Sequence, residues 1–272
     1  MSDPTSLQKQ IREEVYASID LWKDIIVDEL GDKIEFMFSK GSCTKKWDSI
    51  IDYVPLVSDV DIHMYMKTYE DAKQVESDLS LAMKVSSKYA KEFSDAYPDA
   101  LHLPRIQFLV LNEFANHPLY CPPKPEQVHQ MVGKCPRKRQ PLPDKIREID
   151  KTNTLEEASF LQKLPNMIID RTGLELWTLL RRFTYRISPA PVRVITQTHK
   201  DPAEVWTWNR TKIVEYLIEN DMQVIAKEYS RFYELGWELF QNNFEGMERY
   251  HEMFSAGTRV LSYSIACMTD SE

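Results

Sequence analysis

The chain has 272 residues, of which 43% are hydrophobic and 28% charged, a composition typical of a globular fold with room for two modest cores. Its net charge of −8 argues against a protein that coats nucleic acid, because the overall field would repel a polyanion. No segment has the roughly 18 consecutive apolar residues of a membrane span, and the start MSDPTSLQKQ lacks the blocks of a secretory signal. Four scattered cysteines indicate reduced thiols. We therefore expect a cytoplasmic protein with no membrane contact.

The N-terminal part of the chain predicts short strands mixed with helices. Apolar side chains have helical spacing over 7–30, and Gly31 ends that helix. Strands are predicted at 33–39, 59–67 and 105–112, with a helix near 70–97. The proline-rich stretch 114–142 has no clear period and predicts a long irregular connection.

From about Thr154 onward the pattern is that of amphipathic helices. These are predicted near 154–164, 174–187, 203–219, 221–241 and 244–265. The start of the 203–219 helix is marked by Asp201 as N-cap and by Pro202 at the first position. The fold class is therefore α+β, with an N-terminal domain over 1–115, a proline-rich basic linker over 116–153 and an all-α bundle over 154–272.

Two aspartates carry the strongest chemical signal. In the segment from Ser58 to Met66, Asp59 and Asp61 alternate with apolar residues. Side chains at i and i+2 of a strand share a face, so both carboxylates project together. Two adjacent carboxylates repel unless a cation lies between them, and Mg²⁺ accepts one or two protein carboxylates and fills its other positions with water and phosphate oxygens. The pattern predicts a magnesium site at Asp59 and Asp61.

A Gly-Ser turn follows the first predicted strand. Gly41 permits close backbone approach and positive φ, and Ser42 adds a hydroxyl. Lys40, Lys45 and Lys46 surround the turn with positive charge. Such a turn can hold a triphosphate, so Gly41, Ser42, Lys45 and Lys46 are the predicted phosphate ligands.

Each motif alone is common, but their order is informative. A strand, a Gly-Ser turn, a stretch with lysines and Trp47, and an Asp-hydrophobic-Asp-hydrophobic strand together resemble the signature of the DNA polymerase β-like nucleotidyltransferase superfamily. The matching residues are Phe38, Gly41 and Ser42, then Asp59, Val60, Asp61 and Ile62. The resemblance covers roughly residues 30–115.

The resemblance implies a mixed-sheet catalytic core in which two aspartates bind Mg²⁺ and orient a nucleoside triphosphate. A substrate hydroxyl then attacks the α-phosphorus and pyrophosphate leaves. The appended helical domain resembles the layout of the small-molecule- and antibiotic-modifying branches and of several RNA-modifying ones. ATP is the expected donor, and a hydroxyl-bearing small molecule is the expected acceptor.

The chain departs from this pattern in two places. Sixteen residues separate Ser42 from Asp59, which indicates a small insertion around 50–57. Active members of the superfamily generally carry a third carboxylate on a neighbouring strand, and the residue that most resembles it here is Gln107. Glutamine cannot act as a general base. A base from elsewhere, catalysis by two aspartates alone, and a degenerate enzyme that only binds nucleotide all remain open.

Three functions therefore stay open from the sequence. The first is Mg²⁺-dependent transfer of a nucleoside monophosphate to a small-molecule hydroxyl. The second is template-independent nucleotidyl transfer to an RNA end, which is less favoured because the only basic run is Lys134 to Arg147. The third is a catalytically silent nucleotide-binding or interaction protein. Aromatic-rich helical segments also leave a homodimer open.

Overall fold

The computed structural model describes residues 4–117, 120–138 and 141–269, which form two compact units. The first, here called the sheet unit, takes its residues from 1–46 and 58–140. The second, the helical unit, takes them from 47–57 and 141–272. The short segment 47–57 is called the strap below. It joins the Gly-Ser turn to the two aspartates along the chain but belongs to the helical unit.

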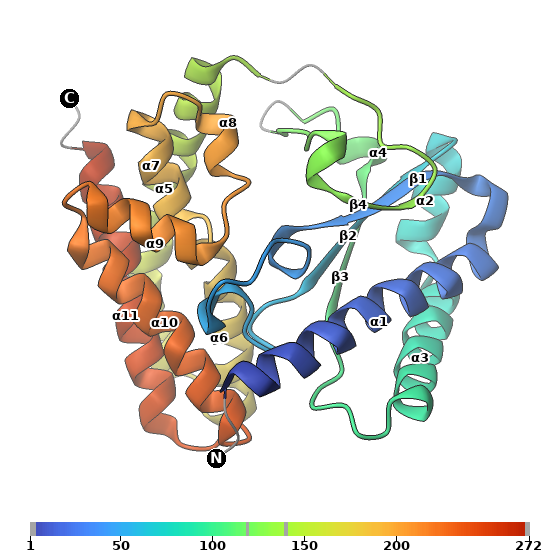
Figure 1. Cartoon of the computed structure of the whole chain (residues 1–272), viewed down its shortest axis with the longest axis horizontal. Helices are drawn as coiled ribbons and strands as arrows, with labels where there is room; N and C mark the ends of the chain where they lie inside the picture. Colours follow the sequence, from blue (N-terminus) through green and yellow to red (C-terminus); the bar gives the residue numbers. More distant parts are fainter. Residues whose placement is uncertain (1–3, 118–119, 139–140, 270–272) are drawn as a thin grey trace. The chain divides into compact units, whose positions relative to one another are not determined.

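A four-stranded mixed sheet forms the centre of the sheet unit (Figure 1), and with the helices it confirms the predicted α+β class. Its strand order is β3-β2-β1-β4. The central pair β1 (Ile34–Lys40) and β2 (Val60–Met66) is antiparallel. On the outer sides, β3 (Ile106–Val110) runs parallel to β2, and β4 (His129–Val132) runs antiparallel to β1.

One face of the sheet packs against α1 (Pro4–Leu30) and α3 (Leu79–Ala96). Trp22 of α1 makes an edge contact with Tyr89 of α3, their ring centroids 5.3 Å apart, and lies 5.8 Å from Phe108 of β3. Phe108 is the register partner of Ile62, which is fully buried. Because side chains alternate along a strand, Asp61 and Gln107 project to the opposite face.

That opposite face has an aromatic part and a polar part. The aromatic part is a cluster built on Phe36, Phe38, Leu111 and Cys135, against which Tyr65 and Leu109 pack. Phe38 pairs with His63 in register, and two residues further along β1 Lys40 pairs with Asp61. The polar part of the face therefore lies where β1 ends and β2 begins.

The sheet unit confirms the predicted strands and the first helix to within a few residues. The single helix predicted over 70–97 is wrong, because the chain forms α2 (Tyr69–Ser77) and then α3. Asp78 separates them by accepting a hydrogen bond from the Leu81 amide at 2.9 Å as the N-cap of α3. Strand β4 and the short helix α4 (Leu111–Phe114) lie within or at the edge of the stretch predicted to be irregular.

The helical unit contains the helices predicted after residue 154, with changed boundaries. Asp201 caps α8 as predicted, but the helix expected over 203–219 is interrupted before α9, which Asn209 caps through the Lys212 amide at 2.9 Å. Helix α7 was not predicted. The helices of this unit are α5 (Pro143–Ile169), α6 (Gly173–Ile187), α7 (Ala190–Thr198), α8 (Pro202–Val205), α9 (Arg210–Glu219), α10 (Gln223–Gln241) and α11 (Met247–Thr269).

The strap is fixed in the helical unit by polar contacts to its backbone. Arg210 of α9 donates to the carbonyls of Ile51 at 2.8 Å and Asp52 at 3.0 Å. Trp237 of α10 donates to the Ile50 carbonyl, and Arg181 of α6 to those of Leu56 and Val57. The strap is therefore an integral part of this unit's core.

Asp52 anchors the strap from within. Its buried carboxylate accepts hydrogen bonds from the amides of Asp48 at 2.7 Å and Ser49 at 3.0 Å. It also accepts from the amide of Thr211 at 2.9 Å and from that residue's hydroxyl at 2.8 Å. A buried carboxylate with this many donors is well compensated for its loss of water.

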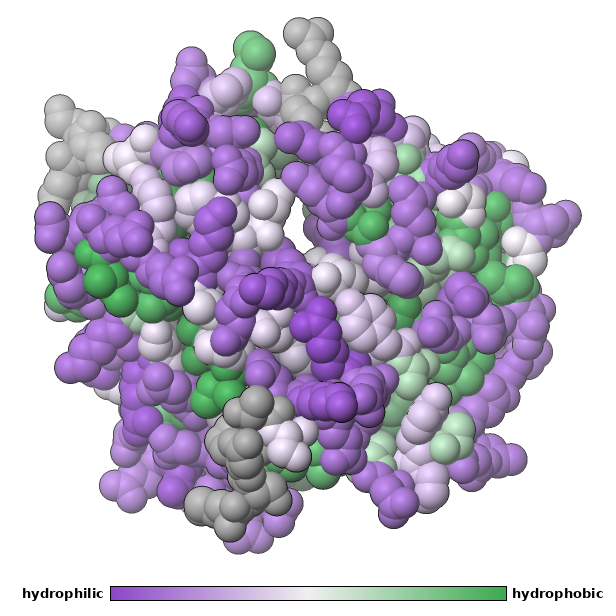
Figure 2. All heavy atoms as spheres, in the orientation of Figure 1, coloured by the Kyte–Doolittle hydropathy of each residue, from purple (hydrophilic) through white to green (hydrophobic). Residues whose placement is uncertain are grey.

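Over the face drawn in Figure 2, hydrophilic residues predominate and hydrophobic ones occur in small groups. Within the described part of the chain, no helix combines the length and the apolarity needed to cross a membrane.

Candidate functional site

Asp59 and Asp61 lie at the start of β2, on the polar part of the sheet face. Asp59 directly precedes the strand and Asp61 is its second residue. Both carboxylates meet the side-chain amide of Gln107. Its orientation is assigned from these partners, with Nε2 2.9 Å from Asp59 Oδ2 and 3.2 Å from Asp61 Oδ1. The structure therefore brings the two aspartates together, and both contact the same residue of β3, Gln107.

The register of β3 explains the position of Gln107. Asp61 and Gln107 are partners in the parallel pair, so their side chains project side by side. Arg105 lies two residues before Gln107, and its Nη2 donates to Asp59 Oδ2. The Asp59 side chain is 14% exposed, so this ion pair is partly shielded from water. Gln107 thus lies beside Asp61 on the neighbouring strand.

Gly41 links the Gly-Ser turn to Asp61 by close contact. The residue has φ of +84°, and a Cβ added to it would overlap Asp61 Oδ2 and lie 3.3 Å from Asp61 Cγ. The Gly41 carbonyl accepts from the amides of Thr44 and Lys45, each at 3.3 Å, and so closes the turn. Only glycine meets both the backbone conformation and the space available.

Cations surround the two carboxylates. Burial and then the charge of Asp59 raise the pKa of Asp61, while Lys40, Arg105 and Lys45 lower it. Burial lowers the pKa of Lys40, an effect that its neighbour Asp61 opposes. A further positive charge beside these carboxylates would favour their ionised forms, because it would offset both the burial and the repulsion that raise the pKa of Asp61.

The four predicted phosphate ligands, Gly41, Ser42, Lys45 and Lys46, lie at different places along the turn and the residues after it. Gly41 and Ser42 form the turn, and Lys45 lies near enough to Asp61 to affect its pKa. The Lys45 carbonyl accepts from Arg12 of α1 at 3.5 Å. Lys46 is exposed and is the last residue of the sheet unit before the strap.

Two further polar side chains of this region are fully or nearly buried. The Cys43 thiol donates to the Lys40 carbonyl at 3.0 Å, and burial raises its pKa, so the group stays a neutral thiol. Burial and then Lys40 lower the pKa of His63 to about 3, so its imidazole stays neutral at physiological pH. Neither group has the charge state of an activated nucleophile.

Arg105 and Lys40 were not among the predicted site residues. The available signal was strand alternation, which places Arg105 on the face of Gln107 and Lys40 opposite Asp61 once the strand register is known. Sequence alone does not supply that register.

The donor set fits one hard divalent cation. Mg²⁺ binds through one or two carboxylates and keeps several water or phosphate ligands, and Asp59 and Asp61 supply two carboxylates on one face. Among the described residues no group of three or more His, Cys, Asp or Glu side chains forms a protein-only metal cage. A cation here would therefore complete its shell with water or with phosphate oxygens.

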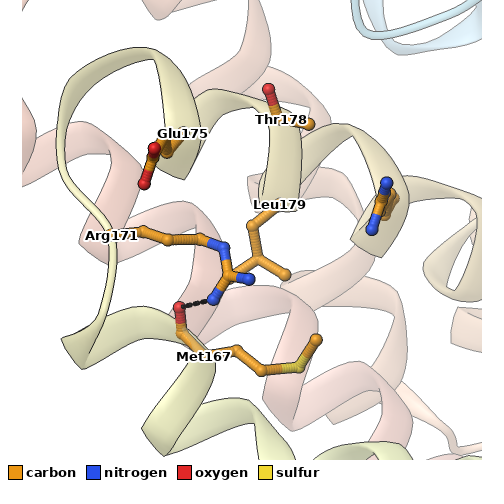
Figure 3. A pocket seen from close by; sticks show the side chains of 6 residues that line it. Met167, Arg171, Glu175, Thr178 and Leu179 are labelled. Atoms are coloured by element: carbon orange, nitrogen blue, oxygen red, sulfur yellow. Dashed lines mark hydrogen bonds between the residues drawn. The ribbon is translucent and has the colours of Figure 1, made fainter.

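A separate surface pocket of about 270 Å³ lies in the helical unit (Figure 3). It is formed at the end of α5 and along α6, where Arg171, Glu175, Thr178 and Arg182 supply polar groups. Arg171 donates to the Met167 carbonyl at 2.6 Å. None of the predicted site residues lines this pocket.

Comparison of the chain with protein-family models, with curated proteins and with solved structures found no match.

Proposed function

We propose that Asp59 and Asp61 bind Mg²⁺ together with the triphosphate of a nucleoside triphosphate, ATP being the expected donor. On this proposal the protein is a nucleotidyltransferase of the DNA polymerase β-like type. It transfers a nucleoside monophosphate to a hydroxyl of a small molecule and releases pyrophosphate.

The observation that carries the proposal is the fit of the Gly-Ser turn to Asp61. Gly41 has a positive φ and no room for a Cβ against the Asp61 carboxylate. The turn that would hold phosphate and the carboxylate that would hold cation are thus in direct contact. A Mg²⁺ ion that binds both carboxylate and phosphate oxygens needs the two kinds of group close enough to share its coordination shell.

Each residue has a part in the proposed reaction. Asp59 and Asp61 hold and orient the cation, while Gly41, Ser42, Lys45 and Lys46 hold phosphate oxygens. Bound Mg²⁺ supplies neutralisation of the charge that develops on the transferred phosphoryl group. The acceptor oxygen bonds to the α-phosphorus, the bond to the bridging oxygen breaks, pyrophosphate leaves with the electron pair, and the hydroxyl proton passes to water.

A second candidate function is metal-independent nucleotide binding without turnover. The observation that favours it is the contact of the aspartates with Arg105 and Gln107, which supply one positive charge to Asp59 and hydrogen-bond donors to both carboxylates. Lys40, Lys45 and Arg105 would then attract the triphosphate directly, and the protein would act through contacts with a partner.

A transfer assay with ATP labelled at the α-phosphate tests the proposal. Wild-type protein with Mg²⁺ and a panel of hydroxyl compounds is expected to release pyrophosphate and label at least one acceptor. Asp61→Asn keeps the size and an acceptor oxygen but removes the charge, and it is expected to lower the rate by about 100-fold or more. Equal rates in the two proteins would contradict the assignment. ATP binding that is unaffected by EDTA and gives no product would support the second candidate.

A further inference from the structure

The side chains around Asp59 and Asp61 limit the number of cations that the site can hold. Two-metal phosphoryl-transfer sites hold their cations about 3.5–4 Å apart and bridge them with shared anionic ligands. A second cation therefore needs an additional anionic side chain beside the two aspartates. The place where the sheet would supply it is β3, the neighbour of β2 on the side away from β1.

Gln107 fills that place with hydrogen-bond donors. Its Nε2 donates to Asp59 Oδ2 at 2.9 Å and to Asp61 Oδ1 at 3.2 Å. An amide N–H carries positive partial charge, so it neutralises the sides of the carboxylates that face β3. A cation approaching from that side would have to displace both hydrogen bonds and would gain no negative charge.

Arg105 adds a full positive charge to the same side. Its guanidinium donates to the same Asp59 oxygen that Gln107 contacts, and it lies on the same face of β3. Lys40 extends the positive charge to the β1 side, because it is the register partner of Asp61. Arg105 and Lys40 together thus match the two negative charges of Asp59 and Asp61 before any cation binds.

From these contacts we infer that the site holds one divalent cation per chain with its triphosphate, and that Gln107 and Arg105 occupy the place of a second. This inference rests on the proposed function, since it concerns the cation of that same site. The single cation accompanies the nucleotide, and the acceptor oxygen is positioned without a metal of its own.

Equilibrium dialysis with Mn²⁺ and a non-hydrolysable ATP analogue tests the inference without relying on turnover. The excess Mn²⁺ on the protein side counts bound cations per chain. Wild type is expected to saturate at one. Gln107→Glu replaces the amide donor with a carboxylate and is expected to saturate at two.

Gln74→Glu is the matched control, because it makes the same substitution on the exposed surface of α2 and keeps the oxygen that accepts from Lys33. It is expected to bind one Mn²⁺, as wild type does. Two bound cations in wild type would overturn the inference. A count of one in a folded Gln107→Glu variant would overturn it too. Either result would leave the proposed function intact. No bound cation in wild type would reject the proposed function itself. The wild-type count decides the question even if Gln107→Glu does not fold.

Discussion

Replacing Gly41 by alanine tests the contact between the turn and the carboxylates. The substitution has two separable costs. An L-residue in the left-handed region costs about 1–2 kcal/mol. The added methyl group would also overlap Asp61 Oδ2, so the carboxylate must move.

Gly31→Ala is a control that isolates the second cost. Gly31 also has a positive φ, +47°, but a Cβ there would meet nothing within 4 Å. Gly31→Ala is therefore expected to lose about 1–2 kcal/mol of unfolding free energy in urea titrations, and Gly41→Ala is expected to lose more. Only Gly41→Ala displaces a carboxylate that is proposed to bind the cation.

The effect on binding follows from that displacement. Moving one of two carboxylate ligands is expected to weaken Mg²⁺-dependent ATP binding by about tenfold or more, or about 1.4 kcal/mol, measured by calorimetric titration. Gly31→Ala is expected to bind as wild type does. Wild-type affinity in Gly41→Ala, or an equal loss in both variants, would refute the proposed link between turn and carboxylate.

Two further predictions concern the helical unit. Asp52→Ala removes the acceptor of four hydrogen bonds, including two from Thr211, and is expected to cost about 3 kcal/mol or more in urea unfolding; a loss below about 1 kcal/mol would contradict this. Burial raises the pKa of Asp150 to about 6, although Thr196 and Trp206 donate to it and lower the pKa. In the unfolded state the pKa of an aspartate is about 3.9. Between about pH 4 and about pH 6 the unfolded state therefore binds fewer protons at Asp150 than the folded state does. The free energy of unfolding falls as the pH rises from about 4 to about 6. Asp150→Asn should therefore be more stable than wild type at pH 7, by at most about 3 kcal/mol, with the difference narrowing towards pH 4; a difference that does not change with pH would contradict the assignment.

The strands of the sheet unit were predictable because their signals are local. A short hydrophobic run predicted the strand before the Gly-Ser turn. Alternation of apolar residues predicted the strand that carries Asp59 and Asp61 and placed both on one face. Strand β4 has no such signal, since its four residues are half-buried or exposed and are ordered by pairing with β1. The Asp78 cap was a readable signal that the long amphipathic pattern over 70–97 obscured.

The strap shows why long-range structure could not be predicted. Its length between Ser42 and Asp59 indicated an insertion, but its partners Arg181, Arg210 and Trp237 are more than 120 residues away in the sequence. The same holds for Arg105 at the site, whose pairing with Asp59 depends on the register of β2 and β3. Periodicity identifies elements, whereas their pairing depends on contacts distant in the chain.

Calorimetric titration of ATP with Mg²⁺, repeated in EDTA and with an Asp59→Asn/Asp61→Asn double variant, tests the central claim most directly. The proposal predicts binding that requires Mg²⁺ and is lost in the double variant, while the variant's circular dichroism spectrum stays that of wild type. Binding of equal affinity in EDTA, or no binding of any of the four common nucleoside triphosphates by wild type, would contradict it.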